Sequence, residues 1–205
     1  MKSKSIWLIL IPLILIIIYI SIPKNDTIPS ETTIDSTSWV QWKKEKNESL
    51  KMGEESPIIN KKTFSGLMYY PYNSTYILNF KVQKATKTEL VNITMTDGTV
   101  EQLAFWGTIE GQLDGKAIRM KLFQHENGEL FLPFKDKTAP QETYGGGRYV
   151  DIPISNLHDS GILIDFNYAY NPYCAYNKNY ACPIPPKENQ LEVRIESGEK
   201  ITPSF

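Results

Sequence analysis

The sequence predicts an all-β domain, built as a mainly antiparallel curved sheet or as a partly open barrel or sandwich. From residue 64 onward, apolar and polar residues alternate with a period of two, which is typical of strands. Turn signals such as Asp114-Gly115 join the alternating runs and indicate hairpins. No helical pattern separates the runs, and connections this short require antiparallel pairing. One short amphipathic helix and a separate transmembrane helix are expected before the sheet.

The chain of 205 residues begins with a segment, residues 1–22, that predicts an uncleaved signal-anchor. Residues 6–22 are nearly all apolar and reach the lower length limit for crossing a bilayer. Lys2 and Lys4 precede them, so we expect a single-pass membrane protein with a cytoplasmic N-terminus and an extracytoplasmic C-terminal domain. A cleaved signal peptide is the alternative, although no small-x-small cleavage site follows the apolar run.

A flexible tether and then a single domain are predicted after the membrane segment. Residues 23–37 lack an apolar period, which is typical of a linker. The β-rich domain is expected over 38–205. It begins with a predicted helix at 38–52, on which Trp39 and Trp42 follow helical spacing. We expect both tryptophans to pack on the domain, and contact with the membrane surface is the alternative.

The strands are predicted from apolar alternation and from the turns between them. A Lys- and Thr-rich loop is expected to separate the first two strands, and Asn127-Gly128 marks a second hairpin like that at Asp114-Gly115. The segments predicted to contain strands are 75–83, 89–95, 103–113, 116–124, 125–134, 147–154, 161–166 and 190–196.

Residues 165–189 have the most unusual composition, with five tyrosines, five asparagines, four prolines and both cysteines of the chain. The prolines exclude helix and central strand. A loop this long is usually functional or disordered, and tyrosines carry too much apolar area for disorder. We expect an ordered loop on the sheet, held by a Cys174–Cys182 disulfide in an oxidising compartment. Free thiols and metal or redox chemistry are the alternatives.

A second unusual stretch, residues 134–152, contains three consecutive glycines just before Arg148. Glycine allows backbone angles that other residues avoid, and it lets another chain or a ligand approach closely. A tight turn with a β-bulge is the structural alternative. Arg148 offers a planar fork of donors, either for a structural ion pair or for an anion.

Polar and aromatic residues from these two stretches form the candidate ligand-binding site. Asp165 could instead cap a turn, and Glu188 could merely close the loop. Asn167 and Asn171 could instead satisfy the exposed loop backbone. Asn, Tyr and Arg on ordered loops are typical of recognition surfaces. The candidates are Tyr144, Arg148, Asp165, Asn167, Tyr170, Asn171 and Glu188.

Several chemistries have little support in the sequence. The 22 basic and 23 acidic residues are scattered, so no basic stripe indicates nucleic-acid binding. His125 and His158 lack the spacing of metal ligands, so we expect no metal. No nucleophile elbow or phosphate-binding loop occurs, and no cofactor is expected.

Three blocks of sequence together resemble a known family. "ETYGGGRYVDI", "IDFNYAYNPYCAYNKNYACPIPPKENQLEV" and "IESGEK" are similar to the family catalogued as domain of unknown function 1684, found mainly in bacteria and archaea. The resemblance extends from about Trp39 to Lys200 and includes "FSGLMYYP" and "FKDKT". It implies that residues 144–200 are the distinctive part of the domain, and that relatives include exported and membrane-anchored proteins. It implies no reaction.

The sequence therefore favours a membrane-anchored binding module for a small polar or anionic ligand, formed by the loop 165–189 and the glycine-rich turn. A structural or assembly component of the cell envelope, with the loop docking a protein, is one alternative. A hydrolase-like enzyme that uses Asp165 or Glu188 as acid or base is the other. A binding role is favoured over a catalytic one.

Overall fold

The computed structural model describes residues 36–202. The predicted anchor, 1–22, and nearly all of the predicted tether, 23–37, lie outside the described residues. Between residues 36 and 202, no helix combines the length and the apolar character needed to cross a bilayer.

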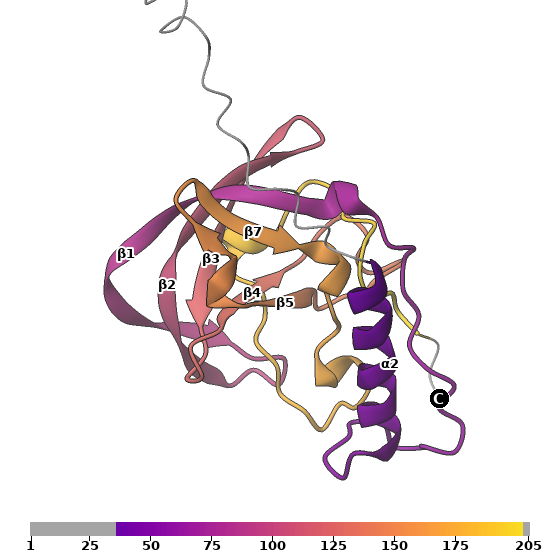
Figure 1. Ribbon diagram of the computed structural model, residues 1–205. Coiled ribbons are helices and arrows are strands. Elements are labelled where there is room, and N and C mark those ends of the chain that lie inside the picture. Colours follow the sequence, from indigo (N-terminus) through magenta and orange to yellow (C-terminus); the bar gives the residue numbers. More distant parts are fainter. Residues whose placement is uncertain (1–35, 203–205) are drawn as a thin grey trace, which may run out of the picture. The chain divides into compact units, whose positions relative to one another are not determined.

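Seven antiparallel strands of the described residues form one open sheet, in the order β5-β4-β3-β2-β1-β7-β6. Figure 1 shows that the long β1 and β2 ribbons bend along their length. The predicted mainly antiparallel sheet with one helix is confirmed. The strands are β1 Ile77–Thr94, β2 Val100–Leu113, β3 Lys116–Gln124, β4 Leu130–Phe134, β5 Arg148–Ile152, β6 Leu157–His158 and β7 Gly161–Asp165.

Strand β1 replaces two predicted strands and the loop predicted between them. It runs without interruption for 18 residues. Its register with β2 shifts between Lys84 and Glu89, where the Lys- and Thr-rich residues form a bulge instead of a loop. Opposite the bulge, a Cβ on Gly107 would lie 2.7 Å from the carbonyl oxygen of Gln83. The missing side chain therefore lets the two backbones approach closely at the bend.

The last predicted strand, 190–196, is an extended segment outside the sheet. Leu191, Val193 and Ile195 are buried in the main core, as the alternation predicts. Only a few backbone hydrogen bonds attach the segment to the chain after β4, such as Leu191 N to Lys135 O at 2.7 Å. The period of two therefore predicted the buried face correctly, but not the strand. Strand β6, with two residues, was too short to predict.

The sheet is covered on both faces. All five residues of β4 are buried, which requires cover on each side of that strand. The main core packs one face, and it includes Phe80, Leu122, Leu132, Phe134 and Phe166. A second cluster packs the other face and brings the loop residues Cys174 and Cys182 against Phe123, Phe131 and Tyr149. The prediction of an ordered loop on the sheet is confirmed.

The loop 165–189 also contains short helical turns that were not predicted. Two of these 3₁₀ helices begin directly after Pro172 and Pro186, which have extended backbone and lie outside the turn, so that their missing N–H groups cost no helical hydrogen bond. The prolines exclude a longer helix, yet they permit single turns. These helices are η3 Phe166–Tyr168, η4 Tyr173–Ala175 and η5 Lys187–Asn189.

Helix α2, Ser36–Met52, confirms the predicted amphipathic helix. It packs beside the loop, as Figure 1 shows. The indole N–H of Trp39 donates to the carbonyl oxygen of Asn167 at 2.8 Å. The ring of Trp42 meets that of Tyr168 edge to face, with centroids 5.1 Å apart. Both tryptophans pack on the domain, as predicted.

Candidate functional site

Arg148, the most conspicuous candidate, lies in the interior at the start of β5 and is 1% exposed. Its Nη2 lies 3.1 Å from Asp136 Oδ1. The same nitrogen donates to the carbonyl oxygen of Ile195 at 2.9 Å, and Nη1 donates to those of Ser197 and Glu199. Only Nε, of the five N–H groups, lacks a partner among the described residues. The guanidinium therefore holds the C-terminal segment in place.

The glycine-rich turn before Arg148 makes room for the chain itself. Gly147 has a φ of +98°, which favours glycine. A Cβ there would lie 2.6 Å from the carbonyl oxygen of Phe134 and 2.8 Å from Cγ of Pro185. The close approach predicted from the glycines is thus made by strand β4 and the proline-rich loop.

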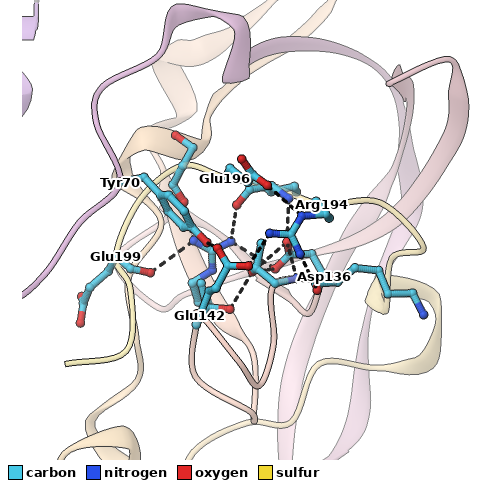
Figure 2. A network of polar contacts seen from close by, with 12 residues as sticks. Tyr70, Asp136, Glu142, Arg194, Glu196 and Glu199 are labelled. Atoms are coloured by element: carbon cyan, nitrogen blue, oxygen red, sulfur yellow. Dashed lines mark hydrogen bonds and ion pairs between the residues drawn. The ribbon is translucent and has the colours of Figure 1, made fainter. Parts of the chain in front are cut away.

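A polar network surrounds the Arg148–Asp136 pair, and Figure 2 shows Asp136, Tyr70, Glu142 and Arg194 within it. The hydroxyl of Tyr70 donates to Glu142 at 2.8 Å, and Glu142 also pairs with Arg194. Asp136 accepts a further hydrogen bond, of 2.7 Å, from the backbone of Ile195. Residues of "FKDKT", "ETYGGGRYVDI" and "IESGEK" therefore meet in one structural network.

Asp165 and Asn167 connect the loop to α2 and to the segment before β1. Asp165 Oδ1 accepts from the backbone N–H of Asn167 at 2.9 Å and so caps η3. Asn167 is fully buried, and its amide donates to the carbonyl oxygen of Asn73 at 3.0 Å. The second oxygen of Asp165 is buried without a partner among the described residues, and desolvation raises the pKa of this carboxyl group.

Glu188 and Tyr144 lie in different surroundings. Glu188 is exposed and forms a 2.7 Å ion pair with Lys121, whose hydrogen bond lowers the pKa of Glu188. Tyr144 is half-buried, and its hydroxyl donates to the sulfur of Cys174 at 3.7 Å. Burial is the main cause that raises the pKa of Tyr144 to about 12. Each side chain already has a partner within the protein.

The predicted disulfide is absent, and Cys174 and Cys182 are both buried free thiols. They are nevertheless neighbours, since the backbone N–H of Cys174 donates to the sulfur of Cys182 at 3.2 Å. A hydrogen bond from Cys182 is the main cause that lowers the pKa of Cys174 to about 6. The same bond raises the pKa of Cys182. Once Cys174 has ionised, the two sulfurs share the proton that remains on Cys182.

A pocket of about 470 Å³ lies between α2 and the loop 165–189. Tyr170 is the predicted site residue that lines it. Cys182 also contributes to the wall. We call this site the aromatic pocket, and its principal lining residues are Trp42, Lys46, Tyr149, Tyr170, Tyr173 and Tyr180.

Lys46 brings a charge to the aromatic pocket. Its Nζ lies 3.1 Å from Glu199 Oε2, and the Lys46 side chain is 16% exposed whereas that of Glu199 is fully buried. The ammonium also lies 4.3 Å from the ring centroid of Tyr170 and 5.3 Å from that of Trp42. Desolvation lowers the pKa of Lys46, and Glu199 opposes this shift.

Asn171 and Tyr176 hold Glu199 in position. The backbone N–H of Asn171 donates to Oε2 at 3.2 Å, and its side-chain amide donates to Oε1 at 2.8 Å. The hydroxyl of Tyr176 donates to Oε1 as well. Asn171 thus supports the ion pair that borders the pocket, although it does not line the pocket itself.

Most hydroxyl groups of the aromatic pocket are already bonded to the protein. The hydroxyl of Tyr170 donates to Asp151 at 2.7 Å, and that of Tyr180 donates to the carbonyl oxygen of Glu55 at 3.3 Å. Tyr149 donates to the carbonyl oxygen of Pro183. The walls therefore offer a ligand mainly ring surfaces, and Lys46 is the charged group among the lining residues.

Sequence reasoning missed Trp42 and Lys46 as site residues. Trp42 was predicted only to pack on the domain or to contact the membrane surface, and the partner of Lys46 lies 153 residues further along the chain. A lysine one turn after a tryptophan on the same face of a helix was the available signal. Nothing local indicated that Glu199 would face it.

The family model described as a protein of unknown function, DUF1684, matches residues 62–200. The chain belongs to this family. The solution NMR structure of an uncharacterised protein of Haloarcula marismortui is similar, with 32% sequence identity and a TM-score of 0.65. The match covers 80% of this chain and 93% of that chain. No curated protein matches the chain.

The DUF1684 match includes one wall of the aromatic pocket and excludes the other. The loop wall lies inside the matched residues 62–200, as does Glu199. Trp42 and Lys46 lie before the matched region. Among residues 36–202 of this DUF1684 protein, no three side chains of His, Cys, Asp or Glu gather as a metal site.

Proposed function

We propose that this DUF1684 domain binds a small polar or anionic ligand in the aromatic pocket. One observation carries the proposal: the ammonium of Lys46 borders a cavity of about 470 Å³ whose walls are mostly aromatic. Cavities of roughly 300–1,000 Å³ with apolar walls and a few placed polar groups are typical of small-molecule sites.

The walls are held in place before any ligand arrives. Tyr149 and Tyr170 meet edge to face with centroids 5.8 Å apart, and Tyr173 and Tyr180 do so at 5.4 Å. Lys46 is fixed by Glu199, which is itself held by Asn171. A preformed site loses less conformational entropy on binding, which supports a binding role.

The residues predicted from sequence take different parts in this proposal. Tyr170 would contact the ligand, and Asn171 would hold Glu199 behind Lys46. Asp165 and Glu188 have separate partners, Asn167 and Lys121, so a shared acid–base role has little support. We therefore propose a binding protein and not a hydrolase.

We also infer that the domain is anchored on the outer side of a membrane. The apolar run 6–22 and the preceding Lys2 and Lys4 support this location. Protease treatment of intact cells tests it: an external protease should degrade the domain while leaving cytoplasmic markers intact. Full protection of the domain would contradict the inference.

A ligand screen on the full-length protein in detergent tests the binding role. Carboxylates, sugars and amines are added singly, and a ligand of the native state should raise the melting temperature. Tyr173→Ala removes a pocket wall that is 45% exposed, and it should abolish the shift. Leu90→Ala, at a position 62% exposed on β1, is the matched control and should keep the shift. A shift that survives Tyr173→Ala would place the binding elsewhere.

A further inference from the structure

The chemistry of the aromatic pocket narrows the class of ligand. We infer that it binds an amphipathic monoanion, namely a flat, apolar ring system that carries one carboxylate, with the carboxylate on Lys46 and the ring against the tyrosines. This inference rests on the proposed function and adds the identity of the ligand class.

The ammonium of Lys46 has hydrogen-bonding capacity to spare. It has three N–H donors, and its hydrogen bond within the described residues goes to Glu199. Glu199 also accepts hydrogen bonds from Asn171 and Tyr176. Lys46 is therefore one of several donors to the Glu199 carboxylate. A ligand carboxylate can therefore take the remaining donors without displacing Glu199. Charge-assisted hydrogen bonds of this kind are stronger than neutral ones.

The nearby acid Asp151 is also occupied. Its Oδ1 lies 3.1 Å from Nε2 of His125, and its Oδ2 accepts from the hydroxyl of Tyr170. These contacts direct both oxygens of Asp151 to other side chains. Glu199 forms the ion pair with Lys46, and the charge of Asp151 also opposes the lowering of the pKa of this lysine.

The walls favour an apolar ring over a sugar. A sugar presents hydroxyl groups around its ring, and each needs a partner when it leaves water. The hydroxyls of Tyr149, Tyr170 and Tyr180 already donate to protein acceptors. A flat aromatic ring needs no such partners, and it gains from edge-to-face contacts with tyrosine rings.

The ring surfaces are poorly suited to a cationic ligand. Aromatic walls commonly attract cations, but Lys46 already occupies the faces of Tyr170 and Trp42. A second cation in the same pocket would be repelled by this ammonium. The ammonium that lies over these rings therefore disfavours a cationic ligand.

Three probes test the inference on full-length protein by titration calorimetry. Indole-3-acetate carries the ring and the carboxylate, indole-3-acetamide carries the ring without the charge, and glucose carries neither. We expect saturable binding of indole-3-acetate and no binding of glucose. The affinity for indole-3-acetamide should be lower than that for indole-3-acetate by about tenfold or more. Equal affinities for acetate and acetamide, or no saturable binding of the acetate, would overturn the inference.

The glucose titration, repeated with Tyr173→Ala, shows whether the inferred ligand class or the proposed binding site is wrong. Glucose binding that Tyr173→Ala removes would refute the ligand class and keep the pocket as a binding site. If Tyr173→Ala leaves the affinity for indole-3-acetate unchanged, both the inference and the proposed site are wrong.

A charge-neutral double variant tests the role of Lys46. Lys46→Met alone leaves Glu199 buried and unpaired, so this variant risks unfolding. The variant Lys46→Met/Glu199→Gln removes both charges and keeps an acceptor for Asn171. In this double variant, the affinity for indole-3-acetate should fall by about tenfold or more, to that measured for indole-3-acetamide. The affinity for indole-3-acetamide should stay as in the wild-type protein. Unchanged affinity for the acetate would refute the contact with Lys46.

Discussion

Lys46 and Glu199 lie 153 residues apart in the chain, yet their charged atoms are 3.1 Å apart beside the aromatic pocket. The pair joins α2 to the C-terminal segment and places a cation among tyrosine rings. Glu199 is fully buried, so Lys46 and the donors of Asn171 and Tyr176 replace the water that would otherwise solvate its carboxylate.

Removing one charge of this pair should destabilise the fold strongly. Lys46→Ala leaves Glu199 buried without its cation, and we expect a loss of about 3 kcal/mol in the free energy of unfolding. Lys46→Met/Glu199→Gln removes both charges and should be within about 1 kcal/mol of wild type. Urea unfolding followed by circular dichroism measures both. A single variant as stable as the double would show that the pair does not couple the helix to the segment.

Arg148 should matter for stability and Arg119 should not. Arg148→Met leaves Asp136 buried and unpaired, and we expect a loss of about 3–5 kcal/mol. Arg119→Met removes an exposed ion pair with Glu110 and is the matched control, with an expected loss under about 1 kcal/mol. Comparable losses in chemical unfolding of the two variants would contradict the structural role of Arg148.

Asp165→Asn should stabilise the protein at neutral pH. The pKa of Asp165 is raised in the folded state by desolvation, so its ionisation opposes folding above that pKa. The gain in melting temperature should be largest at neutral pH. It should shrink as the pH falls through the raised pKa toward the ordinary value of 3.8.

Asp97→Asn is the control of opposite sign. The hydrogen bond from the Thr99 side chain is the main cause that lowers the pKa of Asp97, so the ionised form favours folding. This variant should be less stable than wild type at neutral pH, and the loss should fade as the pH falls through the lowered pKa. Parallel pH profiles for the two variants would contradict the environments described for these carboxylates.

The thiols should ionise one at a time in the reduced protein. Absorbance at 240 nm should rise by one thiolate near pH 6, because the hydrogen bond from Cys182 lowers the pKa of Cys174 to about 6. The second thiol should stay protonated beyond the ordinary range, since the pKa of Cys182 is raised. Cys182→Ala removes the donor and should return the first step toward 9. Two thiols that titrate together near 9 in wild type would refute the shared proton.

Local signals in the sequence predicted the parts of the fold that depend on neighbours in the chain. Asp114 and Gly115 have φ values of +50° and +72°, as the predicted hairpin turn requires. The prolines and tyrosines of the loop 165–189 predicted an ordered cover for the sheet. In contrast, the continuity of β1 depends on pairing with β2 on both sides of the bulge, which no local pattern reveals.

The candidate site was predictable only in part. Tyr170 was identified from the composition of its loop, and it lines the pocket. Arg148 offered two interpretations, and its burial, which long-range packing determines, favours the structural one. Lys46 carried too weak a signal, since its significance comes from a carboxylate that the sequence places at the far end of the domain.

The position of the Arg148 acceptors in the sequence determines when the domain can complete its folding during synthesis. The three carbonyl groups that accept hydrogen bonds from Arg148 belong to Ile195, Ser197 and Glu199. These residues leave the ribosome after almost all of the domain has been synthesised. Until then the guanidinium has its ion-pair partner, Asp136, but it lacks the three carbonyl acceptors that it needs when it is buried. Folding of the domain therefore finishes only after this C-terminal segment has been synthesised, and until then the nascent chain lacks the contacts that close its interior around Arg148.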